Sequence, residues 1–514
     1  MADEIPIAGL RRLTAVEYDA TIRDILEDQE SNAGLLLPVD PRTPFDNDYT
    51  DQLPSEALVE AAELLATDAA DRLLADSARM TSLLPCTPAS ATDEDCLQMF
   101  AEQWGRRALR RTPTAEEVQL WLHGENGNDG AFEIAGEQDD FAWGVHTIVR
   151  LLLQDPEFLY RVEIGTPVDG DPTLYRLDDF ELATRLSYFL WGSAPADWML
   201  DRAEAGQLST PEDVRDVAVE MLDDPRALDR IDRFHSMWFG YESMPFGGQL
   251  MVDMKQETKS LIERVVFSDD RPWQDLFRST DTYLTSELAE HYGLPAPGTT
   301  AADWVSYGDS GRQGLLSHGT FLSVGGKFGD TSPVQRGLAI RTRVFCQTIP
   351  PPPPGVDADE EPGVGEAICK EDRYAAHRDD AGCAGCHAQI DPVGFGLESY
   401  GPLGQFRSFE PDDPDTAEDE TQCAISGDGE LDGVGAFNGP AELSNLALGE
   451  RYLDTCVQEQ LVRFMNGRFE LDEIDALYLE RLSEQFDGDF TFQNLLLEMV
   501  GSETFVYRRE EATE

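Results

Sequence analysis

The chain is poor in positive charge and above all in lysine. Its 514 residues include 39 lysines and arginines against 100 aspartates and glutamates, a formal net charge of −61. Only four of the basic residues are lysines, namely Lys255, Lys259, Lys327 and Lys370. Such acidity argues against non-specific binding to nucleic acid and against docking on an anionic membrane. It suits a salty environment, although a bias in genomic composition explains the same counts.

Long apolar runs and several familiar catalytic motifs are absent as well. No apolar run reaches the roughly 18 residues needed to cross a bilayer, so we expect no membrane span. The sequence shows no phosphate-binding loop, no dinucleotide-binding glycine pattern, no nucleophile elbow and no zinc-protease helix. Its first residues also lack the basic start and apolar stretch of an export signal. We expect either a cytosolic protein or a mature one in which Met1 stands in place of a leader.

Strand signals are rare, and helical periodicity dominates. Apolar residues recur at a spacing of three to four, and Thr14 with Glu17 forms a capping box. Ser55 is a candidate N-cap of the next helix. Helices are predicted over residues 10–26, 55–74, 114–122, 141–153, 177–189, 211–222, 227–239, 255–267, 335–345, 451–464 and 490–501. At about 150 residues per domain, we expect a mainly α protein of about three to four domains.

One pair of the eight cysteines stands in a distinctive motif. Cys383, Cys386 and His387 form a single C-x-x-C-H sequence, the attachment motif of c-type haem. Two thiols three residues apart share one face of a helical turn, where both reach the haem vinyl groups. The adjacent imidazole then points at the iron. We predict one covalent haem c, anchored by Cys383 and Cys386, with His387 as proximal metal ligand.

Three other interpretations of the motif remain open. The cysteines could form a redox disulfide, although no thioredoxin-like β-α-β unit surrounds them. They could bind zinc with His387 and a fourth ligand such as His377, although a second close ligand pair is missing. The pentapeptide could also have arisen by chance.

The other six cysteines allow 15 pairings. We expect a local Cys86–Cys96 bridge, and the pairs Cys346–Cys369 and Cys423–Cys456 are the other candidates. Haem c and disulfides both require an oxidising compartment, which indicates a periplasmic or extracellular protein.

The order of several long runs resembles a known family. These include LRRLTAVEY at 10–18, residues 44–47, 100–111 and 151–163, and LDDFELATRLSYFLW at 177–191. Further runs follow at residues 314–318 and 331–337, at the motif, which continues into IDPVGFGLE at 390–398, and at residues 461–468. They resemble secreted cytochrome-c-like proteins of planctomycetes and myxobacteria, built of consecutive domains of unknown function (1587, 1595, 1592, 1588 and 1585) around one haem-c motif. The resemblance implies an exported, cytochrome-like protein and leaves its reaction open.

The segment behind the motif supplies candidate walls for the haem. Phe395, Tyr400 and Phe406 offer flat apolar surfaces. Pro392 is a further cofactor-binding candidate, because a carbonyl near it could accept the Nδ1 hydrogen of His387. The distal ligand decides the function. Met465 and His318 are the candidates. The alternatives are that Met465 only fills the core, that His318 is a structural histidine, and that the distal side of the iron is open. The smaller residue that the family has at position 465 leaves the role of Met465 open.

We expect five segments: an N-terminal helical domain over 1–85, a second helical segment over 96–165 and a central helical domain over 174–300. A haem-motif domain with a proline run covers 305–407, and a C-terminal helical domain over 430–510 closes on the haem region. The leading function is electron transfer, and the acidic surface favours a cationic redox partner. One alternative is a haem-dependent oxidase or peroxidase with a substrate cleft in the helical region. Another is a binding or scaffold protein for a secreted hydrolase-like partner.

Overall fold

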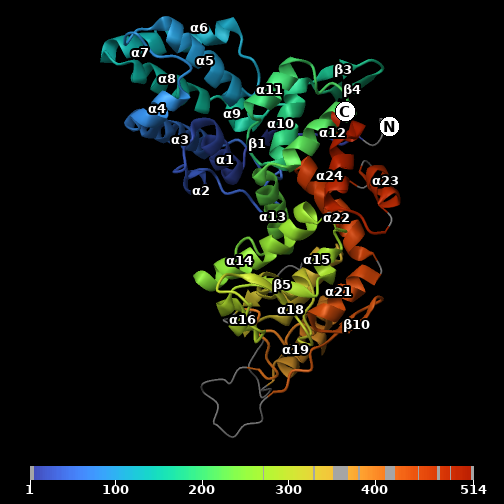
Figure 1. The fold of residues 1–514 in the computed structure, drawn as a ribbon. Coiled ribbons are helices and arrows are strands. Elements are labelled where there is room, and N and C mark those ends of the chain that lie inside the picture. The colour runs from blue at the N-terminus through green and yellow to red at the C-terminus, as the bar shows by residue number, and fades with distance from the viewer. Residues whose placement is uncertain are drawn as a thin grey trace. The chain divides into compact units, whose positions relative to one another are not determined.

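A computed structural model of the chain describes residues 5–269, 271–327, 330–350, 369–379, 383–410, 423–449, 451–471, 475–486 and 488–510. Helices dominate this part of the chain, as the periodicity predicts, and its strands form sheets of two or three (Figure 1). The chain forms two compact units. Unit 1 comprises residues 1–231, 461–480 and 496–514, and unit 2 comprises 232–460 and 481–495. This division does not test the five expected segments.

Unit 1 begins with a short strand and a series of helices. Its helices are α1 (Ala15–Leu26), α2 (Ala33–Leu36), α3 (Glu56–Ala75), α4 (Ser77–Leu83), α5 (Glu94–Leu109), α6 (Ala115–His123), α7 (Ala131–Gln138), α8 (Phe141–Leu153), α9 (Pro156–Leu159), α10 (Asp179–Leu190), α11 (Asp197–Glu204), α12 (Pro211–Leu222) and α25 (Glu503–Val506). Strand β1 (Arg11–Arg12) pairs antiparallel with β2 (Tyr160–Arg161). A second sheet has the order β11-β4-β3, formed by β3 (Thr166–Val168), β4 (Asp171–Arg176) and β11 (Tyr507–Arg509).

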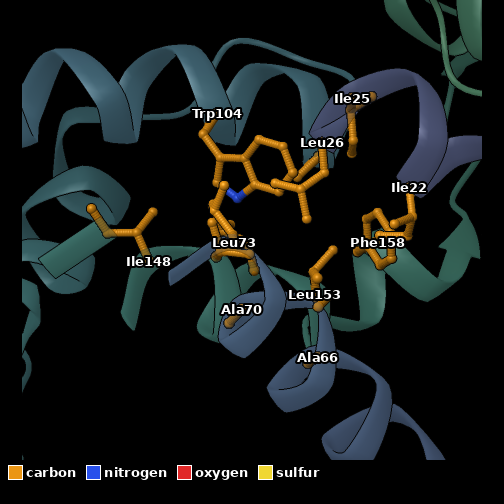
Figure 2. Packing of buried hydrophobic residues seen from close by; sticks show 14 of the residues in the cluster. Ile22, Ile25, Leu26, Ala66, Ala70, Leu73, Trp104, Ile148, Leu153 and Phe158 are labelled. Carbon is orange, nitrogen blue, oxygen red and sulfur yellow. The ribbon is translucent and has the colours of Figure 1, made fainter. Parts of the chain in front are cut away.

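The first half of unit 1 has a large apolar core. Helix α8 packs against α3, α5 and α7, and Figure 2 shows Leu73, Trp104 and Ile148 brought together from α3, α5 and α8. These three side chains are at most 2% exposed. Each fully buried Leu or Ile contributes roughly 1.5–3 kcal/mol relative to an exposed one, which makes this core the main support of the region.

Unit 2 mixes helices with two-stranded ribbons. Its helices are α14 (Gln249–Ile262), α15 (Asp275–Arg278), α16 (Ser286–Tyr292), α17 (Gly319–Leu322), α18 (Pro333–Ala339), α19 (Lys370–Asp379), α20 (Ala384–Phe395) and α21 (Gly439–Gly449), with π-helical turns η2 (Glu263–Ser268) and η4 (Ile340–Val344) and the 3-10 turn η3 (Leu315–Ser317). The ribbons pair β5 (Asp281–Leu284) with β6 (Asp303–Ser306), β7 (Gly326–Lys327) with β8 (Asp330–Thr331), and β9 (Asp428–Leu431) with β10 (Gly435–Asn438).

Four helices contain residues of both units, because the unit boundaries fall inside them. They are α13 (Pro225–Phe239), α22 (Tyr452–Asn466), α23 (Ala476–Gln485) and α24 (Phe492–Val500). No helix in the described ranges is both long and apolar enough to cross a membrane.

The local helix signals are confirmed. Thr14 and Glu17 form the predicted capping box at α1, and the Ser55 side chain accepts from the Leu58 N–H at the start of α3. The predicted helices over 141–153 and 211–222 are α8 and α12, with the same bounds. Four of the five prolines at 350–354 lie outside the described residues, so the proline run is not described.

Candidate functional site

The C-x-x-C-H motif forms the first turn of helix α20. Cys383 occupies the N-cap position, and its carbonyl accepts hydrogen bonds from the N–H groups of Cys386 (3.2 Å) and His387 (3.1 Å). The side chains of Cys383, Cys386 and His387 are all partly exposed. Both thiols and the imidazole are therefore presented from one helical turn, the arrangement that thioether attachment of haem requires.

A buried carboxylate orients the motif histidine. Nδ1 of His387 lies 3.0 Å from Oδ1 of Asp391, one helical turn further on. Asp391 is fully buried, and its Oδ2 has no hydrogen-bond partner among the described residues. A carboxylate accepts, so this contact places the imidazole proton on Nδ1 and the lone pair on Nε2.

This partner differs from the predicted one. We expected a backbone carbonyl near Pro392, and the structure instead uses the Asp391 side chain. The i, i+4 spacing of His387 and Asp391 was the sequence signal for it, because such residues are neighbours on a helix. As a rule, the second hydrogen bond of a metal-bound imidazole fixes its tautomer and increases its basicity.

The disulfides leave the two motif cysteines as thiols. The predicted Cys86–Cys96 bridge is confirmed. The other two predicted pairs are wrong, because the bonds join Cys346 to Cys456 and Cys369 to Cys423. Packing rather than nearness in sequence brings these partners together: Cys346 follows η4, and its partner Cys456 lies 110 residues further on, in α22. Cys383 and Cys386 belong to no disulfide and keep their thiols.

Glycines allow α20 to pack closely against its neighbours. A Cβ on Gly394 would lie 1.8 Å from the Pro333 carbonyl oxygen, and one on Gly337 would lie 2.0 Å from the Ile390 carbonyl oxygen. Helices α18 and α20 therefore touch backbone to backbone. By contrast, a Cβ on Gly385, inside the motif, would meet nothing within 4 Å.

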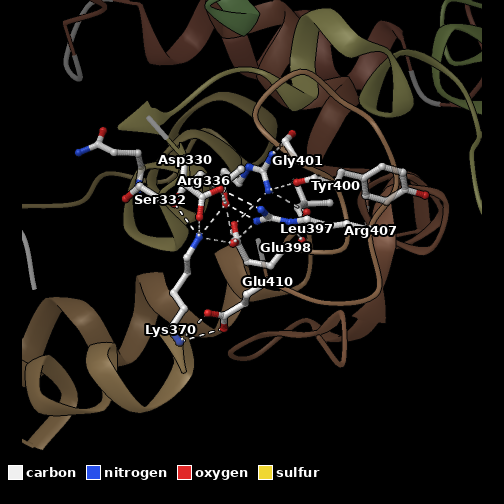
Figure 3. A network of polar contacts seen from close by, with 12 residues as sticks. Asp330, Ser332, Arg336, Lys370, Leu397, Glu398, Tyr400, Gly401, Arg407 and Glu410 are labelled. Carbon is white, nitrogen blue, oxygen red and sulfur yellow. Dashed lines mark hydrogen bonds and ion pairs between the residues drawn. The ribbon is translucent and has the colours of Figure 1, made fainter. Parts of the chain in front are cut away.

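A buried ion network fixes the loop that follows α20 (Figure 3). Glu398, 3% exposed, accepts from Arg336 (3.0 Å), Lys370 (3.0 Å) and Arg407 (3.0 Å). Asp330 binds Lys370 (2.6 Å) and Arg407 (2.8 Å). Burial alone would raise the pKa of Glu398, but the three cations outweigh it and lower the pKa.

The same network shows what Arg336 does. The Ser332 side chain caps α18 by accepting from the Gln335 N–H, with Pro333 at the first helical position. The guanidinium of Arg336 also donates to the carbonyls of Leu397 (2.8 Å) and Tyr400 (2.7 Å). Arg336 is thus a structural tie between α18 and the loop after α20.

The four cofactor-binding residues predicted behind the motif fall into two groups. Pro392 and Phe395 lie on α20 itself, and the Phe395 ring meets Tyr374 edge-on at 6.1 Å. Tyr400 and Phe406 lie on the following loop with ring centroids 5.7 Å apart. Tyr400 is buried under the guanidinium of Arg312, whereas Phe406 is 57% exposed. Their role against a haem stays a prediction.

The two candidate distal ligands occupy different environments. His318 is fully buried in unit 2, where its Nδ1 lies 3.0 Å from the Thr258 hydroxyl and its Nε2 lies 3.7 Å from Glu257 Oε1. Burial lowers the pKa of His318 to about 3. Met465 is 5% exposed and belongs to unit 1, whereas the haem motif belongs to unit 2. Ligation by either residue stays a prediction.

The zinc interpretation finds no further ligands. The residues that the structure describes contain no group of three or more His, Cys, Asp or Glu side chains able to hold a metal ion. The side chain of His377, the proposed fourth ligand, lies outside those residues. What the motif does offer is two thiols and one oriented imidazole, and this donor set fits a covalently attached haem.

Three family models match the chain, in the order of the family that the sequence resembles. Residues 11–75 match Protein of unknown function (DUF1587), residues 177–294 match Protein of unknown function (DUF1592), and residues 312–410 match Protein of unknown function (DUF1588). The C-x-x-C-H motif lies inside the third match. No curated protein and no solved structure matches the chain.

Proposed function

We propose that the chain is an exported, single-haem, c-type cytochrome-like protein that transfers electrons. The observation that supports it most is the first turn of α20, which presents the partly exposed Cys383, Cys386 and His387 together. The three disulfides support export, because such bonds persist in oxidising compartments.

Each residue of the motif has a separate task. Cys383 and Cys386 would form the thioethers, and Nε2 of His387 would bind the iron. The haem, when bound, supplies a one-electron redox couple. Asp391 holds the proton on Nδ1 and keeps the ring in one orientation. The ion network around Glu398 ties the loop behind α20 to Arg336 of α18 and Lys370 of α19.

The partner follows from the charge. A net charge of −61 favours a cationic redox protein, since complementary surfaces accelerate encounter. The association rate should then fall steeply as salt is added.

A haem-dependent oxidase or peroxidase is the second candidate, and the His387–Asp391 contact favours it. A carboxylate on Nδ1 makes an imidazole a stronger donor, which lowers the potential of the iron and supports oxidant chemistry. The chain is also much longer than a simple carrier requires.

Three measurements on the haem-loaded full chain separate the two functions. These are an optical redox titration, a CO-binding spectrum of the reduced protein, and peroxide turnover with a generic electron donor. A carrier shows a reversible couple and neither binds CO nor consumes peroxide. Sustained peroxide turnover assigns the second function. A haem that is neither reversibly reduced nor active contradicts both.

A further inference from the structure

Four of the runs singled out in the sequence meet inside unit 1. They contribute Arg11 on β1, Arg161 on β2, Arg185 on α10 and Asn466 at the end of α22. Arg11 and Arg161 stand directly opposite each other in the antiparallel β1–β2 pair. Side chains at opposed positions share one face, so two like charges are held together.

The cluster has more buried positive than negative charge. Arg11, Arg161 and Arg185 are each at most 7% exposed. One carboxylate faces them: Glu163 pairs with Arg185 through both oxygens (2.9 and 2.5 Å) and lies 3.7 Å from Arg11. Burial would raise the pKa of Glu163, but the three guanidinium groups lower it to about 2. Within the part of the chain that the structure describes, these three cations against one anion leave two positive charges in excess.

Two side chains of the cluster have buried donors without acceptors. Among the described residues, Nε and Nη2 of Arg161 have no hydrogen-bond partner, and the guanidinium lies 5.3 Å from the centroid of the Tyr188 ring. Nδ2 of Asn466 is likewise buried without an acceptor. A buried charged donor without an acceptor is costly, so the arrangement is incomplete as it stands.

A small cavity lies in the cluster. Arg11, Arg185 and Asn466 line it together with residues 6–8, and the space open to the centre of a water-sized guest is about 10 Å³. This is room for a single atom-sized guest. A water molecule would accept hydrogen bonds but would leave the excess charge, whereas a sulfate or phosphate is too large.

We propose that this arginine cluster binds a small monovalent anion of the size of chloride. Arg11, Arg185 and the Asn466 amide would contact the ion at the cavity, and Arg161 would add its charge beside them. The site would link segments far apart in sequence, so anion binding would stabilise unit 1. This proposal is independent of the haem.

Thermal unfolding of the full chain tests it, with gluconate replaced stepwise by chloride at constant ionic strength. We expect the unfolding midpoint to rise with chloride and to saturate. Bromide should act like chloride, and sulfate at equal ionic strength should not. Equal midpoints in gluconate and chloride would overturn the proposal.

Variants locate the effect. Arg161→Gln and Asn466→Leu should each raise the chloride concentration needed for half-saturation by tenfold or more. Arg226→Gln is the matched control, since Arg226 also belongs to unit 1, lies over a tryptophan ring (3.6 Å to Trp191) and has an ion-pair partner in Asp224. An unchanged chloride response in Arg161→Gln would refute the site.

If Arg161→Gln does not fold, crystals of the unmodified chain grown in bromide decide the question. An anomalous peak beside Arg11, Arg185 and Asn466 supports the proposal. Density for water alone at that position contradicts it.

Discussion

Glu257 is a fully buried carboxyl group, and its ionisation should be visible in the stability of the protein. It accepts from Thr282 (2.6 Å) and Tyr292 (2.8 Å). Burial raises its pKa from 4.5 to about 7, although the hydrogen bonds from Thr282 and Tyr292 and the charge of Arg312 act to lower it. Between pH 4.5 and 7 the folded state therefore keeps a proton that the unfolded chain has released. The contribution of Glu257 to the free energy of unfolding is full below pH 4.5 and is lost as the pH rises to 7.

We predict that Glu257→Gln removes this loss. The difference in free energy of unfolding between variant and wild type should shift by about 3 kcal/mol in favour of the variant from pH 4.5 to 7.5. His318, whose lowered pKa costs stability as the pH falls below 6.5, is present in both proteins and cancels. Denaturant unfolding across this pH range measures the shift. Glu220→Gln, an exposed carboxylate (54%), serves as control, and a difference independent of pH would refute the prediction.

Asp391 should tune the haem through His387. Removing its charge in Asp391→Asn weakens imidazole donation, so we predict a higher midpoint potential in the loaded protein, by the order of 60 mV, which is a tenfold change in the ferric–ferrous equilibrium. Spectroelectrochemistry measures it. Asp428→Asn, an exposed residue on the neighbouring strand β9, should leave the potential unchanged. Equal potentials for Asp391→Asn and wild type would show that the carboxylate does not act on the iron.

At the scale of elements, two glycines of α20 should respond in opposite ways to the same substitution. Gly394→Ala forces a methyl group against the Pro333 carbonyl at 1.8 Å, so α18 and α20 must separate. We predict a loss of about 3 kcal/mol or more in stability. Gly385→Ala has open space and should gain up to about 1 kcal/mol from the better helix propensity of alanine. Denaturant unfolding compares the two variants, and similar effects of both would contradict the packing.

Elements were predictable where their signals are local. The Thr14–Glu17 capping box and the Ser55 N-cap need only three or four neighbouring residues, and both form as expected. The motif turn of α20 is equally local. The bounds of α8 were predictable because its apolar face repeats over 13 residues.

Contacts between distant elements were not predictable. Lys370 meets Asp330 across 40 residues, and Cys346 bonds Cys456 across 110. Nothing in the sequence near these residues distinguishes the true partner from other carboxylates or cysteines, because tertiary packing alone brings them together. The arginine cluster of unit 1 was not predictable for the same reason, because only the pairing of β1 with β2 places Arg11 opposite Arg161.

At the scale of the whole molecule, self-repulsion should make stability depend on salt. With a net charge of −61, we predict that the unfolding midpoint rises as sodium gluconate increases from low concentration to 1 M. The screening length falls over this range from about 30 Å at 0.01 M to about 3 Å. Trehalose at equal osmolality separates screening from solute exclusion. A midpoint that falls with gluconate would show that local ion pairs outweigh the general repulsion.

The central claim is that the chain carries one covalent haem at Cys383, Cys386 and His387. The most direct test is a pyridine haemochrome spectrum of the full chain, exported to a compartment with c-haem maturation, beside Cys383→Ser/Cys386→Ser and His387→Ala variants. The account predicts a c-type α-band at one haem per chain in the wild type and none in the cysteine variant. The His387→Ala variant should lack the native ligation of the haem iron. A wild-type chain without covalent haem would contradict the account.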